Sequence, residues 1–243
     1  MALEKLQHVI GRTDWDKACA LSINPGIAYH FCNETLRESF YEGCWKYDSC
    51  KKHSIFASSC AYPIKGFHYL LEAFAQVAQE YPDATLSVTG KSFLGKTFKE
   101  KIRQGSYEKY LADLARKHHL EEKLVFLGHL SAENMKQAYL DANVFVLPST
   151  LENSPNSLGE AMLLGVPSVA ADVGGVRDLM TGETEGLLYR SGDVTALAAH
   201  IIHLFSMEEE ASKLGEAARS HAQRTHDPEA NLRALMKIYE EIR

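Results

Sequence analysis

The residues best suited to chemistry lie between 148 and 162, where two glutamates stand on either side of a predicted helix start. A buried, strand-like run ends at Leu147 and is followed by a loop that carries Glu152. Ser154 is predicted to cap the next helix, and Pro155 suits its first turn. Glu160 then lies about a turn and a half inside that helix.

Such a helix start can bind an anion, because its first amides have no partner within the helix. The amides predicted to be free are those of Asn156, Ser157 and Leu158. With phosphate at the amides and hydroxyls at each glutamate, the arrangement suits a nucleotide-diphosphate sugar. The alternative is a capped helix with two surface acids, and the spacing alone does not separate the two interpretations.

A lysine follows the first strand of the predicted sheet. The loop 58–66 contains Lys65-Gly66 at a helix start but no G-x-G-x-x-G, which argues against an NAD enzyme. An ammonium beside free helix amides makes a phosphate site, whereas a lysine without such neighbours is a solvated side chain.

These candidates follow strands of one repeating pattern. Short strand-like runs alternate with segments of helical spacing, such as Leu70, Phe74, Val77 and Tyr81. This alternation predicts an α/β fold: a Rossmann-like parallel sheet of about six strands with helices on both faces. The predicted strands are 54–58, 85–89, 123–127, 143–147, 167–171 and 186–189.

The two ends of the chain fall outside the pattern. We expect residues 1–52 to be a link without a core of its own, 53–227 to form the Rossmann-like domain, and 228–243 to be a helix. The segments 196–205 and 207–225 are also predicted helices, so the fold carries helical N- and C-terminal extensions. The apolar stripe of the last helix must pack against this domain or a neighbour.

Composition narrows the function classes. A net charge of −6 and a pI near 6.0, with interspersed acids and bases, argue against nucleic-acid binding. No apolar run approaches a membrane span and no signal peptide is evident, so we expect a cytoplasmic protein. Five cysteines favour reduced thiols over disulfides. A zinc cluster of Cys44, Cys50, His53 and Cys60 fits no usual ligand spacing, so no metal site is predicted.

An ordered set of motifs resembles the C-terminal domain of family 4 (group 1) glycosyltransferases. Glu152 and Glu160 are followed by Ala161-Met162, Gly165-Val166-Pro167 and Gly174-Gly175, and the likeness runs from Lys65-Gly66 to Gly186-Leu187. These are retaining enzymes of the GT-B fold, in which two Rossmann-like domains face each other across a cleft.

The resemblance implies a role for each candidate residue. Lys65 would hold the donor diphosphate, Glu160 the ribose hydroxyls and Glu152 the hydroxyls of the transferred sugar. Glu152 is also the candidate catalytic residue, although a carboxylate that holds hydroxyls is a poor nucleophile. Asn156, Ser157 and Leu158 would supply amides, and the backbone of Leu130 would meet the base. The family needs no metal or cofactor here; the nucleotide sugar, with UDP-sugar favoured, is a substrate.

Two departures from the family pattern stand out. The family usually has an arginine shortly before its lysine, but this chain has Ser59-Cys60 there, so Lys91 or Arg12 would have to supply the second cation. The family's N-terminal domain, with its catalytic histidine, is also largely missing. Residues 1–52 would be the end of that domain, and the helix 228–243 would pack back toward it.

The sequence therefore predicts the donor-binding half of a retaining, metal-independent glycosyltransferase, inactive alone. The acceptor would be a saccharide or a lipid-linked molecule, with polysaccharide synthesis as the setting and membrane contact through the missing domain. The alternatives are a nucleotide-sugar-binding module without turnover and a GT-B-type epimerase of UDP-sugars.

Overall fold

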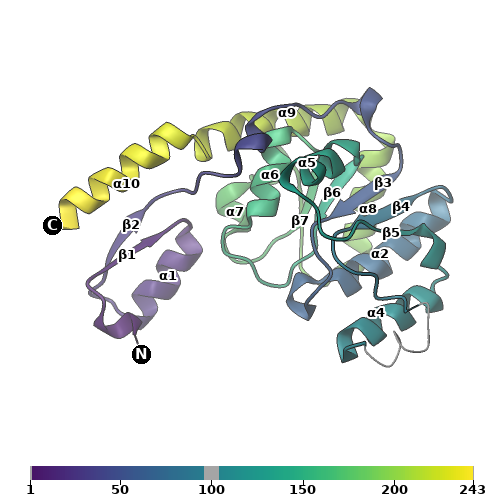
Figure 1. The fold of residues 1–243 in the computed structure, drawn as a ribbon, viewed down its shortest axis with the longest axis horizontal. Helices are drawn as coiled ribbons and strands as arrows, with labels where there is room; N and C mark the ends of the chain where they lie inside the picture. The colour runs from purple at the N-terminus through teal and green to yellow at the C-terminus, as the bar shows by residue number, and fades with distance from the viewer. Residues whose placement is uncertain (1, 96–103, 243) are drawn as a thin grey trace.

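The computed structural model describes residues 2–95 and 104–242, and its centre is a six-stranded sheet (Figure 1). All six strands are parallel, in the order β5-β4-β3-β6-β7-β8. They are β3 (Ser54–Ala57), β4 (Thr85–Val88), β5 (Leu124–Phe126), β6 (Val144–Leu147), β7 (Ser168–Ala171) and β8 (Leu187–Tyr189). The predicted α/β fold is confirmed, and each strand lies within one residue of its predicted ends.

The helices cover the sheet in two layers because the chain winds in both directions from β3. From β3 the chain moves outward through β4 to β5, and it then returns past β3 to β6, β7 and β8. Right-handed crossovers place the helices of the two halves on opposite faces. One layer holds α2 (Phe67–Glu80), α4 (Ser106–Lys117) and α8 (Val194–Ser206); the other holds α5 (Ala132–Asp141), α6 (Asn156–Leu164) and α7 (Val176–Leu179).

One part of the sheet is less covered than expected. Thr85 and Ser87 of β4 are half-buried and Val125 of β5 is exposed, while Leu86 and Val88 on the other face are buried. Helices flank both faces of the sheet as predicted, but at this edge they leave one face uncovered. The α5 crossover lies over β3 and leaves one face of β4 and β5 open.

The N-terminal extension contains strands as well as helices, which corrects the expectation of a helical extension. Residues 2–31 form a small β-α-β unit with a short 3₁₀ turn, η1 (Leu3–Lys5). Strands β1 (His8–Gly11) and β2 (Ala28–Phe31) pair in parallel, and α1 (Asp14–Ile23) connects them. No residue of either strand is buried. Such strands need no run of apolar residues, which is the signal that identified the strands of the large sheet in the sequence.

The segment after β2 packs on the large sheet rather than on the small unit. It contains the 3₁₀ turns η2 (Glu38–Tyr41) and η3 (Tyr47–Ser49). Phe40 and Trp45 are buried in the core around α5 and α6, and Trp45 Nε1 donates to the Ala142 carbonyl at 2.7 Å. The boundary at residue 52 stays a prediction, but core packing crosses it.

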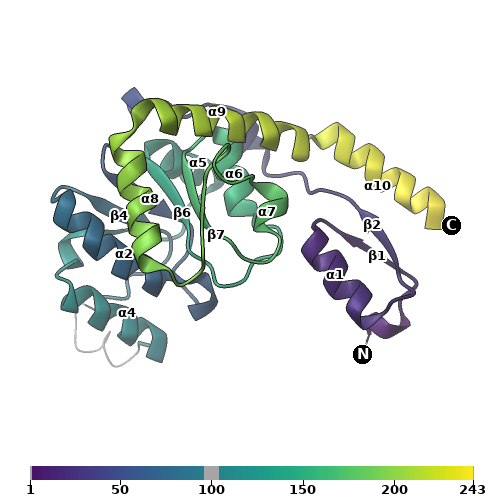
Figure 2. The same ribbon diagram turned by 180° about the vertical axis from the view of Figure 1, so that it is seen from behind.

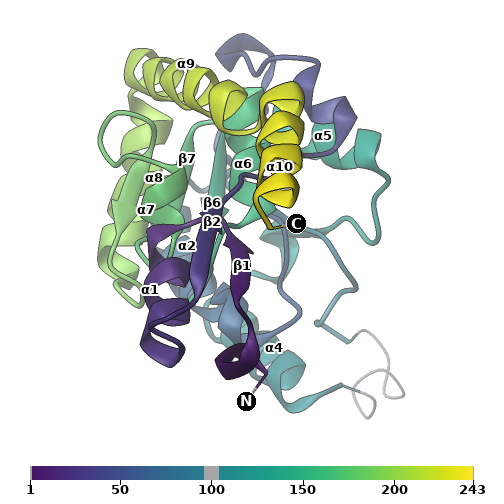
Figure 3. The same cartoon turned by 90° about the vertical axis from the view of Figure 1, so that its left-hand side faces the viewer.

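Three consecutive helices end the chain, as predicted. After α8 come α9 (Glu208–Thr225) and α10 (Pro228–Ile242). Figures 1 and 2 show α9 and α10 following one another out of the body, and Figure 3 shows α10 beside β1 and β2. Cys32 Sγ lies 3.7 Å from the Asn231 carbonyl, which joins α10 to the end of β2. Among the described helices, none combines the length and apolar character needed to cross a membrane.

Candidate functional site

The candidate site lies where the winding of the sheet changes direction, between β3 and β6. In open parallel sheets, ligands bind beyond the carboxyl ends of the strands at such a point. Lys65 ends the 3₁₀ turn η4 (Pro63–Lys65) after β3, and Glu152 lies in the loop after β6. Lys65 Nζ is 2.6 Å from Glu152 Oε1, so the structure brings these two predicted residues into direct contact.

A glycine allows the two loops to approach so closely. Gly66 has φ of 64°, and a Cβ there would lie 1.8 Å from the Pro148 carbonyl oxygen. Thr150 N donates to the Ile64 carbonyl at 2.8 Å and ties the same loops together. Only glycine fits this position, which explains the Lys-Gly pair seen in the sequence.

The Glu152 carboxylate is held through one of its oxygens. Oε1 accepts from Lys65 Nζ and from Ser149 Oγ, the latter at 2.7 Å. Within the part of the chain that the structure describes, Oε2 has no such contact, and the side chain is 12% exposed. Glu152 can therefore accept a further hydrogen bond from a ligand hydroxyl while it stays bound to Lys65.

Helix α6 begins one residue later than predicted. Pro155 is the N-cap in an extended conformation with no side-chain cap, so the prediction that Ser154 caps the helix is wrong. The Pro155 carbonyl accepts from Leu158 N at 3.0 Å and Gly159 N at 3.2 Å. Leu158 N is thus already bonded, and the first-turn amides left to bind an anion are those of Asn156 and Ser157.

Glu160 is buried and paired with an arginine from a distant segment. Arg37 Nε and Nη2 lie 2.8 Å from Glu160 Oε1 and Oε2 respectively. Tyr139 of α5 donates to the Ser157 carbonyl at 2.9 Å, with its hydroxyl 3.5 Å from Glu160 Oε2. Burial, together with the nearby carboxylate, raises the pKa of Tyr139 well above its ordinary value, so it stays a hydrogen-bond donor.

A cavity of about 460 Å³ opens at the ends of β3, β4 and β5, beside the Lys65–Glu152 pair rather than over it. It is lined by Cys60, Tyr62, Lys91, His129 and Leu130, among others. Gly90 N donates to the Gly128 carbonyl at 2.8 Å, which places Lys91 and His129 on neighbouring loops. Arg12 lines a different cavity, beside α10, and is ion-paired with Glu34.

Comparisons with known proteins decide the family. The sequence model of the family "Glycosyl transferases group 1" matches residues 49–221, which is most of the chain. The chain belongs to this family.

Relatives of this glycosyltransferase chain are longer than it is. It is 27% identical to the putative glycosyltransferase YtcC of Bacillus subtilis over 79% of this chain and 46% of YtcC. The chain spans about half the length, or less, of the curated relatives it matches.

Solved structures show the same fold. A sucrose-phosphate synthase from Thermosynechococcus elongatus superposes with a TM-score of 0.82 at 23% identity, covering 99% of this chain and 59% of that one. Anabaena Alr3699/HepE in complex with UDP and glucose has a TM-score of 0.79 at 21% identity, with coverages of 97% and 63%. The six-stranded domain therefore shares its fold with a domain of GT-B glycosyltransferases.

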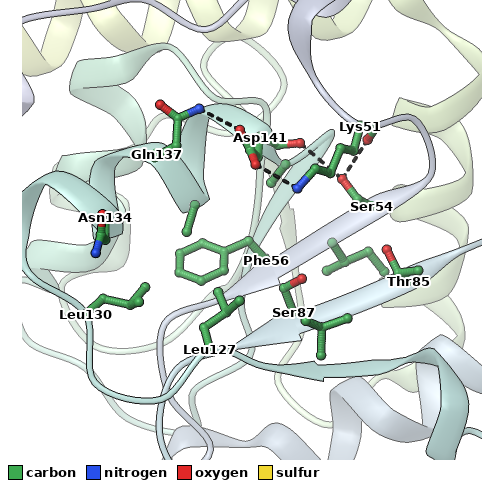
Figure 4. Close-up of a pocket in the computed structure, with 14 residues that line it drawn as sticks. Lys51, Ser54, Phe56, Thr85, Ser87, Leu127, Leu130, Asn134, Gln137 and Asp141 are labelled. Atoms are coloured by element: carbon green, nitrogen blue, oxygen red, sulfur yellow. Dashed lines mark hydrogen bonds and ion pairs between the residues drawn. The ribbon is translucent and has the colours of Figure 1, made fainter.

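A second hollow of the glycosyltransferase domain lies along the open face of β4 and β5 (Figure 4). Its volume is about 410 Å³, and Leu130 lines both this groove and the cavity at the strand ends. A chain of contacts from Gln137 through Asp141 to Lys51 forms one wall. The groove runs along the strands, away from Lys65 and Glu152, and shares Leu130 with the cavity at the strand ends.

The cysteines do not gather into a cluster. Cys50 and Cys60 are buried and Cys44 is exposed. Burial raises the pKa of the Cys60 thiol to about 11. Within residues 2–95 and 104–242, no group of three or more His, Cys, Asp or Glu side chains is placed to hold a metal ion.

Sequence reasoning missed Arg37 and Tyr139 as part of the candidate site. Arg37 is 123 positions from Glu160 and precedes a short 3₁₀ turn, so no local spacing connects them. Tyr139 is fully buried on α5 like a core residue, but its hydroxyl also reaches the start of α6. A buried carboxylate needs a basic partner, and that need was the one available signal.

Proposed function

We propose that this chain is the donor-binding half of a retaining, metal-independent family 4 glycosyltransferase that uses a nucleotide-diphosphate sugar, with UDP-sugar favoured. The contact between Lys65 and Glu152 beside the start of α6 carries the proposal. It brings together a cation for phosphate and a carboxylate oxygen for sugar hydroxyls, and the two helix amides of Asn156 and Ser157 follow Glu152 closely in the chain. Several structurally similar glycosyltransferases were crystallised with UDP, which favours that base.

In this proposal each group has a defined task. Lys65 and the amides of Asn156 and Ser157 bind the diphosphate and stabilise its charge as it leaves. Together with a second cation, these groups would take the place of a metal ion. Oε2 of Glu152 accepts from a hydroxyl of the transferred sugar, which orients the sugar for transfer.

The remaining donor contacts belong to the nucleoside. Glu160 accepts from the ribose, and the backbone of Leu130 meets the base in the cavity at the strand ends. Leu158 contributes less than expected because its amide already donates to Pro155.

Lys91 is the best candidate for the second cation. Lys65 and Arg37 are each paired with a carboxylate, and Arg12 is paired with Glu34, so none of these pairs brings net positive charge. Lys91 lines the cavity that also contains Cys60 and Leu130, and among the described residues it forms no ion pair. Glu108 also lines that cavity, but its carboxylate accepts from Gly105 N at 2.9 Å.

Transfer itself would need a second domain that binds the acceptor, a saccharide or lipid-linked molecule. The chain spans less than half of YtcC, and the apolar side chains of Leu232, Met236 and Tyr239 on α10 are exposed. We propose that the second domain covers them, makes any contact with a membrane from the cytoplasm, and supplies the residues needed for turnover. The chain alone would bind donor without transferring sugar.

The proposal is tested by a calorimetric panel of UDP, GDP, ADP and their glucose conjugates. At least one nucleotide should bind together with its glucose conjugate. Lys65→Ala should weaken the binding of both by about 1.5–3 kcal/mol, as for a charge-assisted bond. Lys51→Ala is the matched control, because Lys51 Nζ pairs with Asp141 at 2.7 Å outside the site. Absence of binding by the whole panel, or equal losses in both variants, would overturn the proposal.

Lys91 is tested by comparing UDP with uridine. Lys91→Gln should weaken UDP about tenfold, the loss of roughly 1.4 kcal/mol of charge-assisted binding, and leave uridine unchanged. Lys109→Gln on the exposed side of α4 is the control. A loss of equal size for uridine would assign Lys91 to the base instead of the phosphates.

A further inference from the structure

The buried carboxylate of Glu160 is fixed at both of its oxygens by one side chain. Arg37 donates from Nε to Oε1 and from Nη2 to Oε2, each at 2.8 Å. The Glu160 side chain is 8% exposed, whereas that of Arg37 is 42% exposed. A planar guanidinium bound through two parallel hydrogen bonds sets the plane of a carboxylate as well as its position.

Arg37 is itself held in place. Its guanidinium lies over the ring of Phe40, 4.5 Å from the ring centroid. Phe40 is fully buried and packs edge-on against Tyr139, with ring centroids 5.8 Å apart. The segment after β2 thus places the arginine over a buried ring of the large domain, and movement of the guanidinium would break its contacts with the Phe40 ring and with Glu160.

The remaining hydrogen-bonding capacity of Glu160 is narrow. Each carboxylate oxygen can accept two hydrogen bonds, and Arg37 uses one on each. The Tyr139 hydroxyl lies near Oε2 but donates over a shorter distance to the Ser157 carbonyl. A ligand hydroxyl can therefore donate to the carboxylate only from a fixed direction. Oε1 has the larger unused capacity, because the Tyr139 hydroxyl lies near Oε2.

We infer that Arg37 is a positioning residue that makes the donor site selective for ribose. By fixing Glu160, it presents a carboxylate oxygen to one ribose hydroxyl and lets the site reject nucleotides that lack this hydroxyl. Arg37 acts through Glu160 and need not touch the ligand. The inference rests on the proposed role of Glu160 in ribose binding.

The test measures the preference for UDP over 2′-deoxy-UDP and over 3′-deoxy-UDP by calorimetry. The wild-type protein should prefer UDP over at least one deoxy analogue about tenfold, as expected for one hydrogen bond to a charged group. Arg37→Gln should reduce this preference to less than threefold while it changes the affinity for that deoxy analogue less than twofold. Arg37→Lys keeps the charge but not the two parallel bonds, so it should not restore the preference.

A matched control separates positioning from stability. Arg219 also contacts α6, where its Nη1 donates to the Leu163 carbonyl at 2.8 Å, but it lies at the opposite end of the helix from the site. Arg219→Gln should leave the ribose preference unchanged. If Arg37→Gln does not fold, Arg37→Lys decides by the same criterion, because it leaves Glu160 intact and removes the two parallel bonds; a preference retained in Arg37→Lys would then overturn the inference.

The outcomes distinguish this inference from the proposed function. A wild-type preference that Glu160→Gln abolishes and Arg37→Gln retains would overturn the inference alone. Equal weakening of all three ligands by Arg37→Gln would also overturn it, because that is the result of a purely structural role. If the wild-type protein binds UDP and the deoxy analogues with equal affinity, and Glu160→Gln does the same, then Glu160 does not bind the ribose. That result would overturn the proposed role of Glu160, on which the inference rests.

Discussion

At the scale of single residues, each predicted acid of the site is neutralised by a cation. Lys65 and Glu152 form one pair and Arg37 and Glu160 the other. Each pair is drawn from two different segments of the chain, so the ion pairs also hold the loops of the site together. In the proposed site, a donor diphosphate would share the Lys65 ammonium with Glu152, so the carboxylate would moderate the affinity for the diphosphate.

Glu152→Gln should change two affinities in opposite directions. Removing one negative charge next to Lys65 should tighten UDP binding by about 1 kcal/mol, roughly fivefold. The added affinity for a UDP-sugar over UDP should disappear, because an amide is a weaker acceptor for sugar hydroxyls than a carboxylate. Calorimetry with UDP and UDP-glucose measures both effects.

The Lys51–Asp141 pair supplies the control for this prediction. Its nitrogen-to-oxygen distance of 2.7 Å matches that of the site pair, but it lies at the groove along the sheet. Asp141→Asn should leave both affinities unchanged. Weaker UDP binding by Glu152→Gln would show that Glu152 contacts the nucleotide rather than the sugar.

Local spacing in the sequence identified only part of this site. Lys65 and Glu152 follow strands that the pattern predicts correctly, and both strands end at the same edge of the sheet. Arg37 could not be found in this way, because its partner lies in a different part of the chain and no periodic element carries the arginine. The assignment of the cap to Ser154 was wrong because Pro155 can itself take the extended N-cap conformation.

At the scale of elements, close backbone contacts hold the loops of the site in position. Gly66 lies against Pro148, and Gly174 lies against Glu152, where a Cβ would be 1.9 Å from the Glu152 carbonyl oxygen. Both glycines have positive φ, so a side chain would meet backbone strain as well as a clash. These contacts fix the loops that follow β3, β6 and β7 against one another.

The clash and the strain can be separated by comparing two glycines. Gly66 and Gly128 have φ of 64° and 67°, but a Cβ at Gly128 would meet nothing within 4 Å. Gly128→Ala should cost about 1 kcal/mol of unfolding free energy, the strain of a left-handed alanine. Gly66→Ala should cost at least about 2 kcal/mol more, because the clash is with backbone.

Urea unfolding at constant pH measures both variants. Equal losses at the two positions would mean that the loops can separate without cost, and that the Lys65–Glu152 contact does not depend on this glycine.

His226 links α9 to the helix that carries Glu160. It is buried at the end of α9, its Nδ1 donates to the Glu34 carbonyl at 2.7 Å, and a Cβ at Gly159 of α6 would lie 2.7 Å from its Nε2. Burial lowers the pKa of His226 below its ordinary value near 6.5, although the hydrogen bond opposes this shift. The folded protein therefore holds the imidazole neutral at a pH where the unfolded chain binds a proton.

Stability should consequently fall as the pH is lowered from 7.5 through 6.5 toward the folded pKa. In that window the unfolded state binds more protons than the folded state, so the free energy of unfolding rises with pH. His226→Gln should reduce this slope. The slope should not vanish, since burial also lowers the pKa of His68. Urea unfolding at several pH values measures it, and an unchanged slope in the variant would contradict the assignment.

Elements with a buried apolar pattern were predictable, and those without it were not. The six strands of the large sheet and helix α2 were expected because their apolar residues face the core. Strands β1 and β2 have no buried residue, and their mixture of polar and apolar side chains gives no period-two pattern. Their strand structure depends on pairing with each other and on packing of α1, which single-sequence patterns do not report.

At the scale of the whole molecule, the small β-α-β unit meets the site through the start of α1. Thr13 caps that helix by accepting from Asp16 N at 3.0 Å, and its hydroxyl donates to Asn153 Oδ1 at 2.6 Å. Asp14 N also donates to a carboxylate oxygen of Asp178, a residue of α7, at 3.2 Å. The unit thus contacts the loop that carries Glu152, so movement of the unit would shift the position of Glu152 at the proposed sugar site.

Helix α10 binds this unit with one side and leaves another side uncovered. Ile238 is 7% exposed and Met236 is 54% exposed, although both are apolar and lie two positions apart. Ile238→Ala should cost about 2 kcal/mol of unfolding free energy, the lower range for truncation of a buried isoleucine. Met236→Ala should stay within about 0.5 kcal/mol of the wild-type value.

Urea unfolding at two protein concentrations tests this difference. A cost for Met236→Ala as large as that for Ile238→Ala, or one that grows with concentration, would mean that the exposed side of α10 is already covered in solution by another copy of the chain. A neutral Met236→Ala would leave that face free for the second domain proposed to complete the enzyme. In the two-domain protein, Met236→Lys should then reduce sugar transfer while donor binding remains unchanged.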